Sequence, residues 1–465
     1  MSQKKYWQNL GELKNTEGYQ KLVKDEFEED LPFEEDGKGI LDAKAPRRDF
    51  LKYLGFSTAA AALAAGCETP VVKSIPYLNQ PENLTPGVAQ YYATTFVAEG
   101  DVVPVVAKVR DGRPIKLEGN PLSFINSKGE GTSARVQASV LDLYDTGRLR
   151  YPVEIAAKEL KELPSFEAID KKISGQLAGS QVVLLTSTLN SPTTRQIISD
   201  FLAKYPGSRH VQYDAVSYSG LLLANEISYG KRAIPTYHFD KAKVIVGLDA
   251  DFLGTWLSPD EFSSQYAAGR KINQKNPEMS KHIQFEGVLS LTGANADDRF
   301  LHRPSETGAV VLNLLAKLGG NVSAPAIADE KLKKGIDLTA GLLNNNKGAA
   351  LVVCGSNDPN IQVLVNAINE ILGANGTTIN WANPLLTRGG IDSEMDQLVK
   401  DMNAGSVGAL FIYEANPAYN YHNAADFMKG LQKVKLSASF SDRADETSAL
   451  CKYLIPHHHY LESWG

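Results

Sequence analysis

The stretch ALFIYEANP, residues 409–417, contains the pattern on which the fold prediction depends. Its first five residues, Ala409–Tyr413, form an apolar run of strand length, as expected for a strand that is buried on both faces. Four similar runs occur in the chain, at residues 182–185, 243–248, 349–353 and 452–455. Helical stretches lie between them, at residues 191–203, 308–318, 361–372 and 424–431. Such an alternation predicts an α/β fold with two Rossmann-like lobes, each built on a parallel sheet.

The region before residue 151 has a different pattern, which is rich in β-strand signals. Residues 102–109 are apolar apart from one lysine, Asp111-Gly112-Arg113 reads as a turn, and residues 114–118 alternate between apolar and polar. This predicts a hairpin with a two-residue Asp-Gly turn, and a helix is expected at 134–144. We therefore divide the chain into four parts: a leader at 1–66, a β-rich region at 67–150, an α/β lobe at 151–348 and a second α/β lobe at 349–465. The second lobe looks incomplete, because only nine residues follow Pro456.

The leader ends in RRDFLKYLGFSTAAAALAAGC, residues 47–67. Its apolar part, residues 54–65, would span about 18 Å as a helix, whereas a bilayer core needs about 30 Å. Two arginines, a short apolar run and small residues fit a signal peptide. Arg47 and Arg48 resemble the twin-arginine export motif, and Cys67 ends a stretch that resembles a lipoprotein box, in which it would carry lipid. The alternative is an amphipathic helix that ends in a buried cysteine.

Charge and cysteine content exclude several classes of protein. The 465 residues carry a formal charge of −6, so nothing attracts nucleic acid. The three cysteines, Cys67, Cys354 and Cys451, include no C-x-x-C pair. A conventional iron–sulfur cluster takes about four thiolates and a structural zinc site about four Cys or His ligands, so neither fits. We expect Cys354 and Cys451 to be buried core thiols.

Three short motifs resemble ligand sites but are better explained by local structure. Gly129–Ala134 matches G-x-G-x-x-A, but no strand precedes it. Asp392–Asp396 spaces three carboxylates like a cation loop, yet Gln397 stands where an EF-hand needs glycine, and a helix start explains the acids. Of the adjacent His457, His458 and His459, at most two could bind one ion, so a strand-end loop with polar contacts is expected. The sequence thus predicts no catalytic, cofactor-binding or metal-binding residue.

Several segments together resemble the molybdopterin oxidoreductases. They are GRPIKLEGNP at 112–121, QASVLDLYD at 137–145, HFDKAKVIV at 238–246 with DFLG at 251–254, ALFIYEANP at 409–417, DET at 445–447 and LESWG at 461–465. The extended leader and KSIPYLNQPENLTPG, residues 73–87, more narrowly resemble the B subunit of bacterial alternative complex III. The region at 91–101 lacks the cysteines of a cluster motif. No Cys or selenocysteine ligand for molybdenum stands out in the middle region, and Ser or Asp ligation stays open.

This resemblance implies a cofactor-free scaffold subunit of a quinol oxidoreductase in the respiratory chain. It implies [4Fe-4S] and [3Fe-4S] clusters in a following region and haem c on partner subunits. The implied partners are quinol-binding membrane subunits, c-type cytochrome subunits and the iron–sulfur region. The chain would lie at the periplasmic face of the bacterial inner membrane, exported by the twin-arginine route and held by lipid or by partners.

Two alternatives remain open at this point. The chain could be an active periplasmic molybdopterin-dependent reductase of a sulfur compound or oxyanion, with the pterin near Asn416-Pro417 and Pro456–His459. It could also be a periplasmic lipoprotein that binds a small ligand between its lobes.

Overall fold

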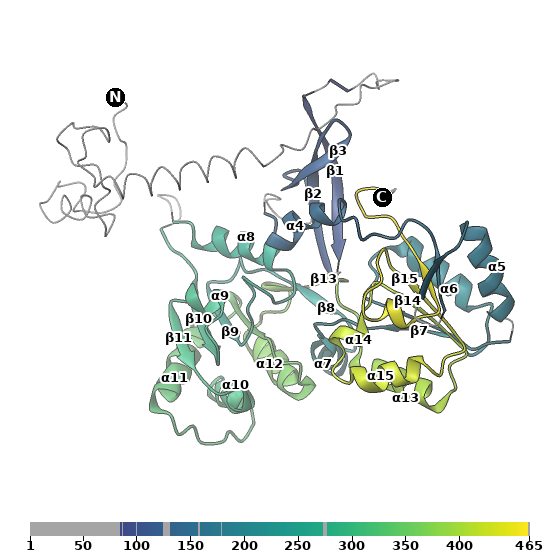
Figure 1. Cartoon of the computed structure of the whole chain (residues 1–465). Coiled ribbons are helices and arrows are strands. Elements are labelled where there is room, and N and C mark those ends of the chain that lie inside the picture. Colours follow the sequence, from purple (N-terminus) through teal and green to yellow (C-terminus); the bar gives the residue numbers. More distant parts are fainter. Residues whose placement is uncertain are drawn as a thin grey trace, which may run out of the picture. The chain divides into compact units, whose positions relative to one another are not determined.

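The computed structural model describes residues 84–85, 87–98, 100–123, 131–156, 159–177, 179–272 and 277–463, all within one compact unit, Asn83–Gly465 (Figure 1). The expected export motif, Arg47 and Arg48, and the expected lipid site, Cys67, lie outside the described residues. Within the described part of the chain, no helix is both long and apolar enough to cross a membrane.

The β-rich region is a three-stranded antiparallel sheet of β1 (Ala89–Ala98), β2 (Asp101–Arg110) and β3 (Arg113–Gly119), in that order. Asp111 (φ 49°) and Gly112 (φ 76°) are both left-handed, as a tight Asp-Gly hairpin turn requires. The predicted hairpin is therefore confirmed. Helix α4 (Ala134–Asp142) packs its buried Val136 into the apolar cluster of this sheet.

The larger α/β sheet has seven strands in the order β5-β4-β16-β15-β14-β6-β7. Their bounds are β4 (Val153–Ala156), β5 (Glu159–Glu162), β6 (Val182–Thr186), β7 (Arg209–Gln212), β14 (Ala409–Tyr413), β15 (Leu436–Phe440) and β16 (Tyr453–Ile455). The five strands from β7 to β16 are parallel, while β4 and β5 are antiparallel additions. Alternate residues of β6 enter different cores. One core contains α5 (Phe166–Leu177) and α6 (Pro192–Leu202), and the other contains α13 (Asp392–Ala404) and α15 (Ala424–Leu431).

The smaller sheet has four parallel strands in the order β11-β10-β9-β12. Their bounds are β9 (Val244–Leu248), β10 (Lys281–Glu286), β11 (Asp298–Leu301) and β12 (Ala350–Cys354). The even-numbered residues of β9 pack against α10 (Thr307–Lys317), α11 (Glu330–Asn345) and α12 (Pro359–Ile371). Ile245 faces the opposite core with α7 (Ser219–Tyr229) and α8 (Pro259–Arg270), and β8 (Ile234–Tyr237) pairs antiparallel with β13 (Ile379–Leu385) nearby. The remaining short elements are α9 (Leu291–Ala294), η2 (Pro304–Glu306), α14 (Pro417–Asn420) and η3 (Ser448–Leu450).

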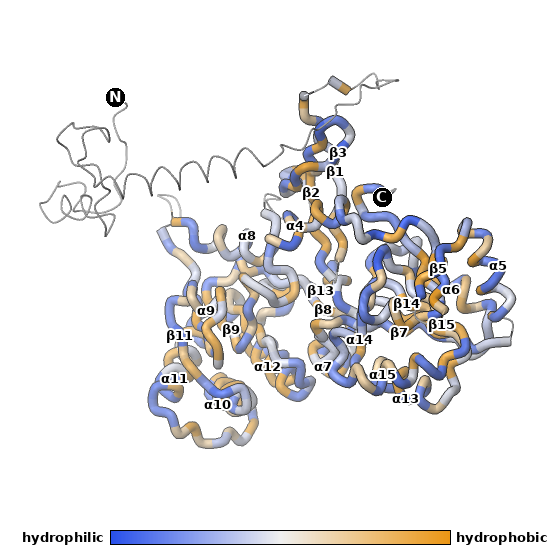
Figure 2. The backbone as a smooth tube through the Cα atoms, in the orientation of Figure 1, coloured by the Kyte–Doolittle hydropathy of each residue, from blue (hydrophilic) through white to orange (hydrophobic). Residues whose placement is uncertain are grey.

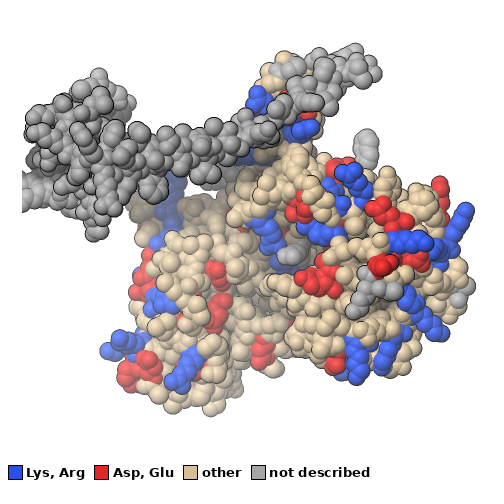
Figure 3. Space-filling model, viewed as in Figure 1, with Lys and Arg blue, Asp and Glu red and all other residues tan. Residues whose placement is uncertain are grey.

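The five strands and four helices predicted after residue 151 are all present, and apolar residues follow the middle strands of both sheets (Figure 2). Each sheet combines strands from both sides of residues 348/349, because β12 pairs with β9 whereas β14 pairs with β6. The last strand, β16, has neighbours on both sides: β15 in parallel and β4 in antiparallel orientation. Acidic and basic side chains are interspersed on the face that Figure 3 shows.

Candidate functional site

A cavity of about 1150 Å³ lies where strands of both sheets end. Its lining includes the residues that directly follow five parallel strands: Ser187 after β6, Tyr213 after β7, Asp249 after β9, Gly355 after β12 and Glu414 after β14. The carboxyl ends of parallel strands are where α/β sheets bind ligands. We therefore treat this strand-end cavity as the candidate functional site.

The lining of the strand-end cavity is acidic. Eight carboxylates and two guanidinium groups line it. The carboxylates are Asp101, Asp142, Asp214, Asp249, Asp251, Glu414, Asp442 and Asp445, and the guanidinium groups are Arg135 and Arg388. Three histidines, His457, His458 and His459, also line it. Such a lining disfavours an anionic ligand unless local donors are free to receive it.

Asp214 is the second residue after the end of β7 and is only 8% exposed. Its Oδ1 accepts a hydrogen bond from the Thr188 backbone N–H at 3.1 Å, and its Oδ2 accepts one from the Thr188 hydroxyl at 2.7 Å. The same Oδ2 accepts from the backbone N–H of Gly390 at 2.9 Å and, at 3.2 Å, from that of Gly389, whose shorter hydrogen bond of 2.7 Å goes to the Thr188 hydroxyl oxygen. Four donors thus converge on one buried carboxylate. Their hydrogen bonds offset the free-energy cost of burying its charge.

Two carboxylates next to the smaller sheet, Asp249 and Asp251, also accept hydrogen bonds from backbone N–H groups and hydroxyls. Asp249 accepts from the backbone N–H of Gly287 and from the Thr307 hydroxyl, both at 3.1 Å. Burial acts to raise the pKa of Asp249, but His302 and these donors together hold that pKa below its ordinary value. Asp251 accepts from the backbone N–H of Thr292 at 3.0 Å and from its hydroxyl at 2.7 Å. Backbone donors at this edge are therefore already engaged by the chain itself.

Arg388 is the buried cation of the cavity, with 7% exposure. Its guanidinium lies 5.7 Å from the centre of the Tyr218 ring, and its Nη2 lies 3.8 Å from Asp101. Its Nε has no hydrogen-bond partner among the residues that the structure describes. A Cβ on Gly100 would meet Arg388 Nη1 at 1.2 Å, so this close approach requires glycine at position 100.

The histidines expected in a strand-end loop lie in one, after β16, and all three line the cavity. His457 Nδ1 contacts the His458 carbonyl at 2.9 Å, and the backbone N–H of His459 donates to Glu462 at 3.1 Å. No group of three or more His, Cys, Asp or Glu residues that could hold a metal ion is found within the described ranges. Asn416 also lines the cavity, and its Oδ1 accepts from the Thr447 backbone N–H at 3.1 Å.

The other short motifs have local structural roles. Asp392 and Glu394 lie in the first turn of α13, and Asp392 accepts from the Ser217 hydroxyl at 2.8 Å. Ser133 caps α4 through the backbone N–H of Val136 at 3.4 Å. The first two residues of the G-x-G-x-x-A match, 129 and 130, lie outside the described residues.

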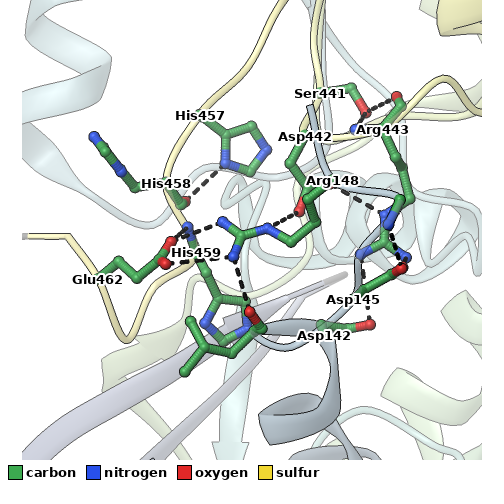
Figure 4. A network of polar contacts seen from close by, with 12 residues as sticks. Asp142, Asp145, Arg148, Ser441, Asp442, Arg443, His457, His458, His459 and Glu462 are labelled. Carbon is green, nitrogen blue, oxygen red and sulfur yellow. Dashed lines mark hydrogen bonds and ion pairs between the residues drawn. The ribbon is translucent and has the colours of Figure 1, made fainter. Parts of the chain in front are cut away.

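A network of ion pairs joins the loop after α4 to the segment after β16 (Figure 4). Arg148 Nη2 lies 2.7 Å from Glu462, and Arg148 Nε lies 3.2 Å from Asp442. The hydrogen bond from Arg148 holds the pKa of Glu462 below its ordinary value. Nearby, the Tyr460 hydroxyl lies 2.8 Å from the Ser139 hydroxyl of α4. These contacts fix the rim of the cavity next to the three histidines.

Cys354 and Cys451 are each 2% exposed and free, which confirms the prediction of buried core thiols. Burial raises the pKa of both thiols to about 12. Neither belongs to the cavity lining that the structure describes. Nothing in the sequence singled out Asp214 or Arg388. The nearest feature that could have pointed to them is the Gly389-Gly390 pair, which precedes the acidic first turn of α13.

The chain is 24% identical, over 464 aligned residues, to the menaquinone reductase, molybdopterin-binding-like subunit of Nitratidesulfovibrio vulgaris strain Hildenborough. The alignment covers 88% of this chain and 65% of the relative, so the chain spans about two thirds of the length of that curated relative. The structure resembles acetylene hydratase from Pelobacter acetylenicus with a TM-score of 0.57 at 15% identity, covering 79% of this chain and 63% of that one. No family model matches the chain.

A molybdopterin cofactor carries phosphate, so a suitable cavity must offer free donors or cations to an anion. Here eight carboxylates face two guanidinium groups. Backbone N–H groups at the strand ends, such as that of Thr188, already donate to carboxylates of the chain. The residues that are present therefore do not fit this cofactor. The chain has the α/β fold of the molybdopterin enzymes, and the lining of its strand-end cavity is unsuited to their cofactor.

Proposed function

We propose that this chain is a scaffold subunit of a membrane-associated quinone oxidoreductase of respiratory electron transport, with a molybdopterin-enzyme fold and without a pterin or metal of its own. One observation carries the proposal. The cavity at the strand ends, where a ligand of this fold would lie, is lined by eight carboxylates and only two guanidinium groups. The relative from Nitratidesulfovibrio vulgaris is a molybdopterin-binding-like subunit of a menaquinone reductase, which supports this kind of complex.

More narrowly, we propose the B subunit of an alternative complex III. In that assignment the electrons pass through [4Fe-4S] and [3Fe-4S] clusters of a following region and through haem c on partner subunits. The chain would dock these carriers over quinol-binding membrane subunits at the periplasmic face. Support comes from the sequence resemblance of the leader and of residues 73–87.

Export is part of the proposal. Arg47 and Arg48 would direct the chain to the twin-arginine route, and Cys67 would carry lipid. We expect Arg48→Lys, combined with Arg47→Lys, to leave the chain in the cytoplasm, and Cys67→Ser to abolish incorporation of labelled fatty acid. Normal export of the double variant would contradict the assignment of the motif.

The decisive measurement is the metal and pterin content of the chain purified from native membranes. We expect molybdenum and tungsten far below one atom per chain, together with co-purification of haem-stained c-type cytochrome subunits. Molybdenum near one atom per chain, with pterin released on denaturation, would instead establish the active reductase. A chain that purifies alone, and whose melting temperature rises with a small ligand, would favour the ligand-binding lipoprotein.

A further inference from the structure

The four donors around Asp214 form a small, buried oxyanion-binding arrangement. Two are the consecutive backbone N–H groups of Gly389 and Gly390, which lie just before the N-terminus of the 13-residue helix α13. The other two are the backbone N–H and the hydroxyl of Thr188, which follows β6. Backbone N–H groups at the positive end of a helix, with a hydroxyl beside them, are the groups that proteins use to bind phosphate.

The arrangement depends on glycine. A Cβ on Gly390 would lie 2.8 Å from the Asp214 nitrogen and 3.0 Å from its Oδ2, closer than side chains tolerate. A glycine that lets backbone donors approach an acceptor this closely is typical of anion-binding loops. Here the acceptor is the protein's own Asp214 carboxylate, where an anion-binding loop would hold a bound anion.

A second feature points to an anion independently of the helix. Arg388 precedes these glycines, lines the same cavity and is 7% exposed. Its Nε–H has no acceptor within the described part of the chain. Its Nη1 donates to the Thr387 carbonyl oxygen at 3.1 Å. A buried guanidinium that keeps one N–H without an acceptor is suited to an oxyanion. Its nearest carboxylate, Asp101, is 3.8 Å away, too far for a hydrogen bond.

We propose that Asp214 is an internal ligand: it occupies an oxyanion-binding site formed by Thr188, Gly389 and Gly390, and thereby excludes phosphate-bearing ligands from the strand-end cavity, which Arg388 also lines. This inference rests on the proposed function, because it names the residue that keeps phosphate-bearing ligands out of the cavity. Asp214 has the role of a specificity-determining residue, since its carboxylate takes the hydrogen bonds that a phosphate oxygen would need.

The test compares pyrophosphate binding by the full chain and three variants, using isothermal titration calorimetry at low salt. Asp214→Ala removes the internal ligand, and Asp214→Asn keeps an acceptor of similar shape without the charge. Asp337→Ala is the matched control, because Asp337 is 51% exposed and pairs with Lys317 outside the cavity. We expect Asp214→Ala to bind pyrophosphate at least about tenfold more tightly than the wild type, Asp214→Asn to gain less, and the control to match the wild type.

Two further arms make the outcome decisive. Arg388→Met combined with Asp214→Ala should lose most of the gained affinity, because it removes the buried cation that lines the same cavity. An Asp214 variant that fails to fold should be rescued by pyrophosphate, since the anion replaces the missing acceptor.

The inference is overturned if folded Asp214 variants bind pyrophosphate no better than the wild type, or if the wild type already binds as tightly as Asp214→Ala. It is also overturned if both Asp214 variants misfold and pyrophosphate rescues neither of them. Molybdenum bound to the wild-type chain would refute the proposed function by a separate measurement.

Discussion

The Asn substitution of Asp297 gives the sharpest prediction about the stability of the smaller sheet. Asp297 lies directly before β11, and both ends of the Arg270 guanidinium reach it: Nη2 to Oδ1 at 2.7 Å and Nη1 to Oδ2 at 2.9 Å. Its Oδ2 also accepts the backbone N–H of His282 at 2.7 Å. The side chains of Asp297 and Arg270 are 17% and 19% exposed. The hydrogen bond from Arg270 is the main reason that the pKa of Asp297 falls from 3.8 to about 2.

The magnitude follows from this pKa. A tenfold change in acid dissociation corresponds to about 1.4 kcal/mol, so the fall in pKa amounts to about 2 kcal/mol of unfolding free energy at neutral pH. Because the folded pKa lies below the unfolded one, this contribution is complete above about pH 5 and is lost as the pH falls towards 2. By pH 3 about 1 kcal/mol of it should be gone. Asp297→Asn should therefore destabilise by about 2 kcal/mol at pH 7 and by clearly less at pH 3.

The assay is urea unfolding at both pH values, with hydrogen exchange of residues 281–301 to localise the effect. The neighbouring Asp298→Asn is the control: Asp298 is 33% exposed and pairs with a Lys281 side chain that is 41% exposed. An exposed pair contributes only about 0–1 kcal/mol. The loss from Asp298→Asn should therefore be smaller than the loss from Asp297→Asn. Equal losses from Asp297→Asn and Asp298→Asn, or a loss from Asp297→Asn that does not change between pH 7 and pH 3, would refute the reasoning.

Three further outcomes are expected. Arg148→Met should cost about 1–3 kcal/mol, because it removes the cation that pairs with both Glu462 and Asp442. Hydrogen exchange after β16 should then accelerate, and unchanged exchange there would contradict the role of this pair. Gly390→Ala should destabilise by about 1–3 kcal/mol through overpacking, whereas Gly341→Ala, where an added Cβ meets nothing within 4 Å, should be neutral or stabilising in thermal melts. Cys354, whose pKa burial raises to about 12, should escape iodoacetamide at pH 8 in the folded chain and react in urea, as peptide mass spectrometry would report; rapid labelling of the folded chain would mean that this strand opens.

The sequence pattern predicted those strands whose side chains are buried on both faces. β6, β9 and β12 are buried at every residue, so their apolar runs are continuous. β5, with the sequence ELKE, is exposed throughout, and β7, with RHVQ, has a single buried residue. Neither carries an apolar signal, so these edge strands could not be predicted. Which strands pair is a further property that periodicity does not contain, because each apolar run suits either sheet.

The site was only partly predictable for a related reason. Asn416 and the three histidines were expected near strand ends and do line the cavity, because a ligand-binding edge follows directly from parallel strands. Asp214 has no such signal. Its donors Thr188 and Gly390 lie 26 and 176 residues away along the chain, so only the folded backbone brings them together.

In each sheet, an acidic residue at the edge of the cavity has an unusual backbone conformation. Asp249 follows β9 with φ 52°, and Glu414 follows β14 with φ 52°. A residue with a side chain in this left-handed region costs about 1–2 kcal/mol, a cost that glycine largely avoids. Two interior strands in separate sheets thus end in a strained acidic residue at the same cavity, and Asp249 offsets the strain through Gly287 and Thr307. Carboxylates that engage the donors of the strand ends give the cavity a stable structure of its own, which the scaffold role that we propose requires.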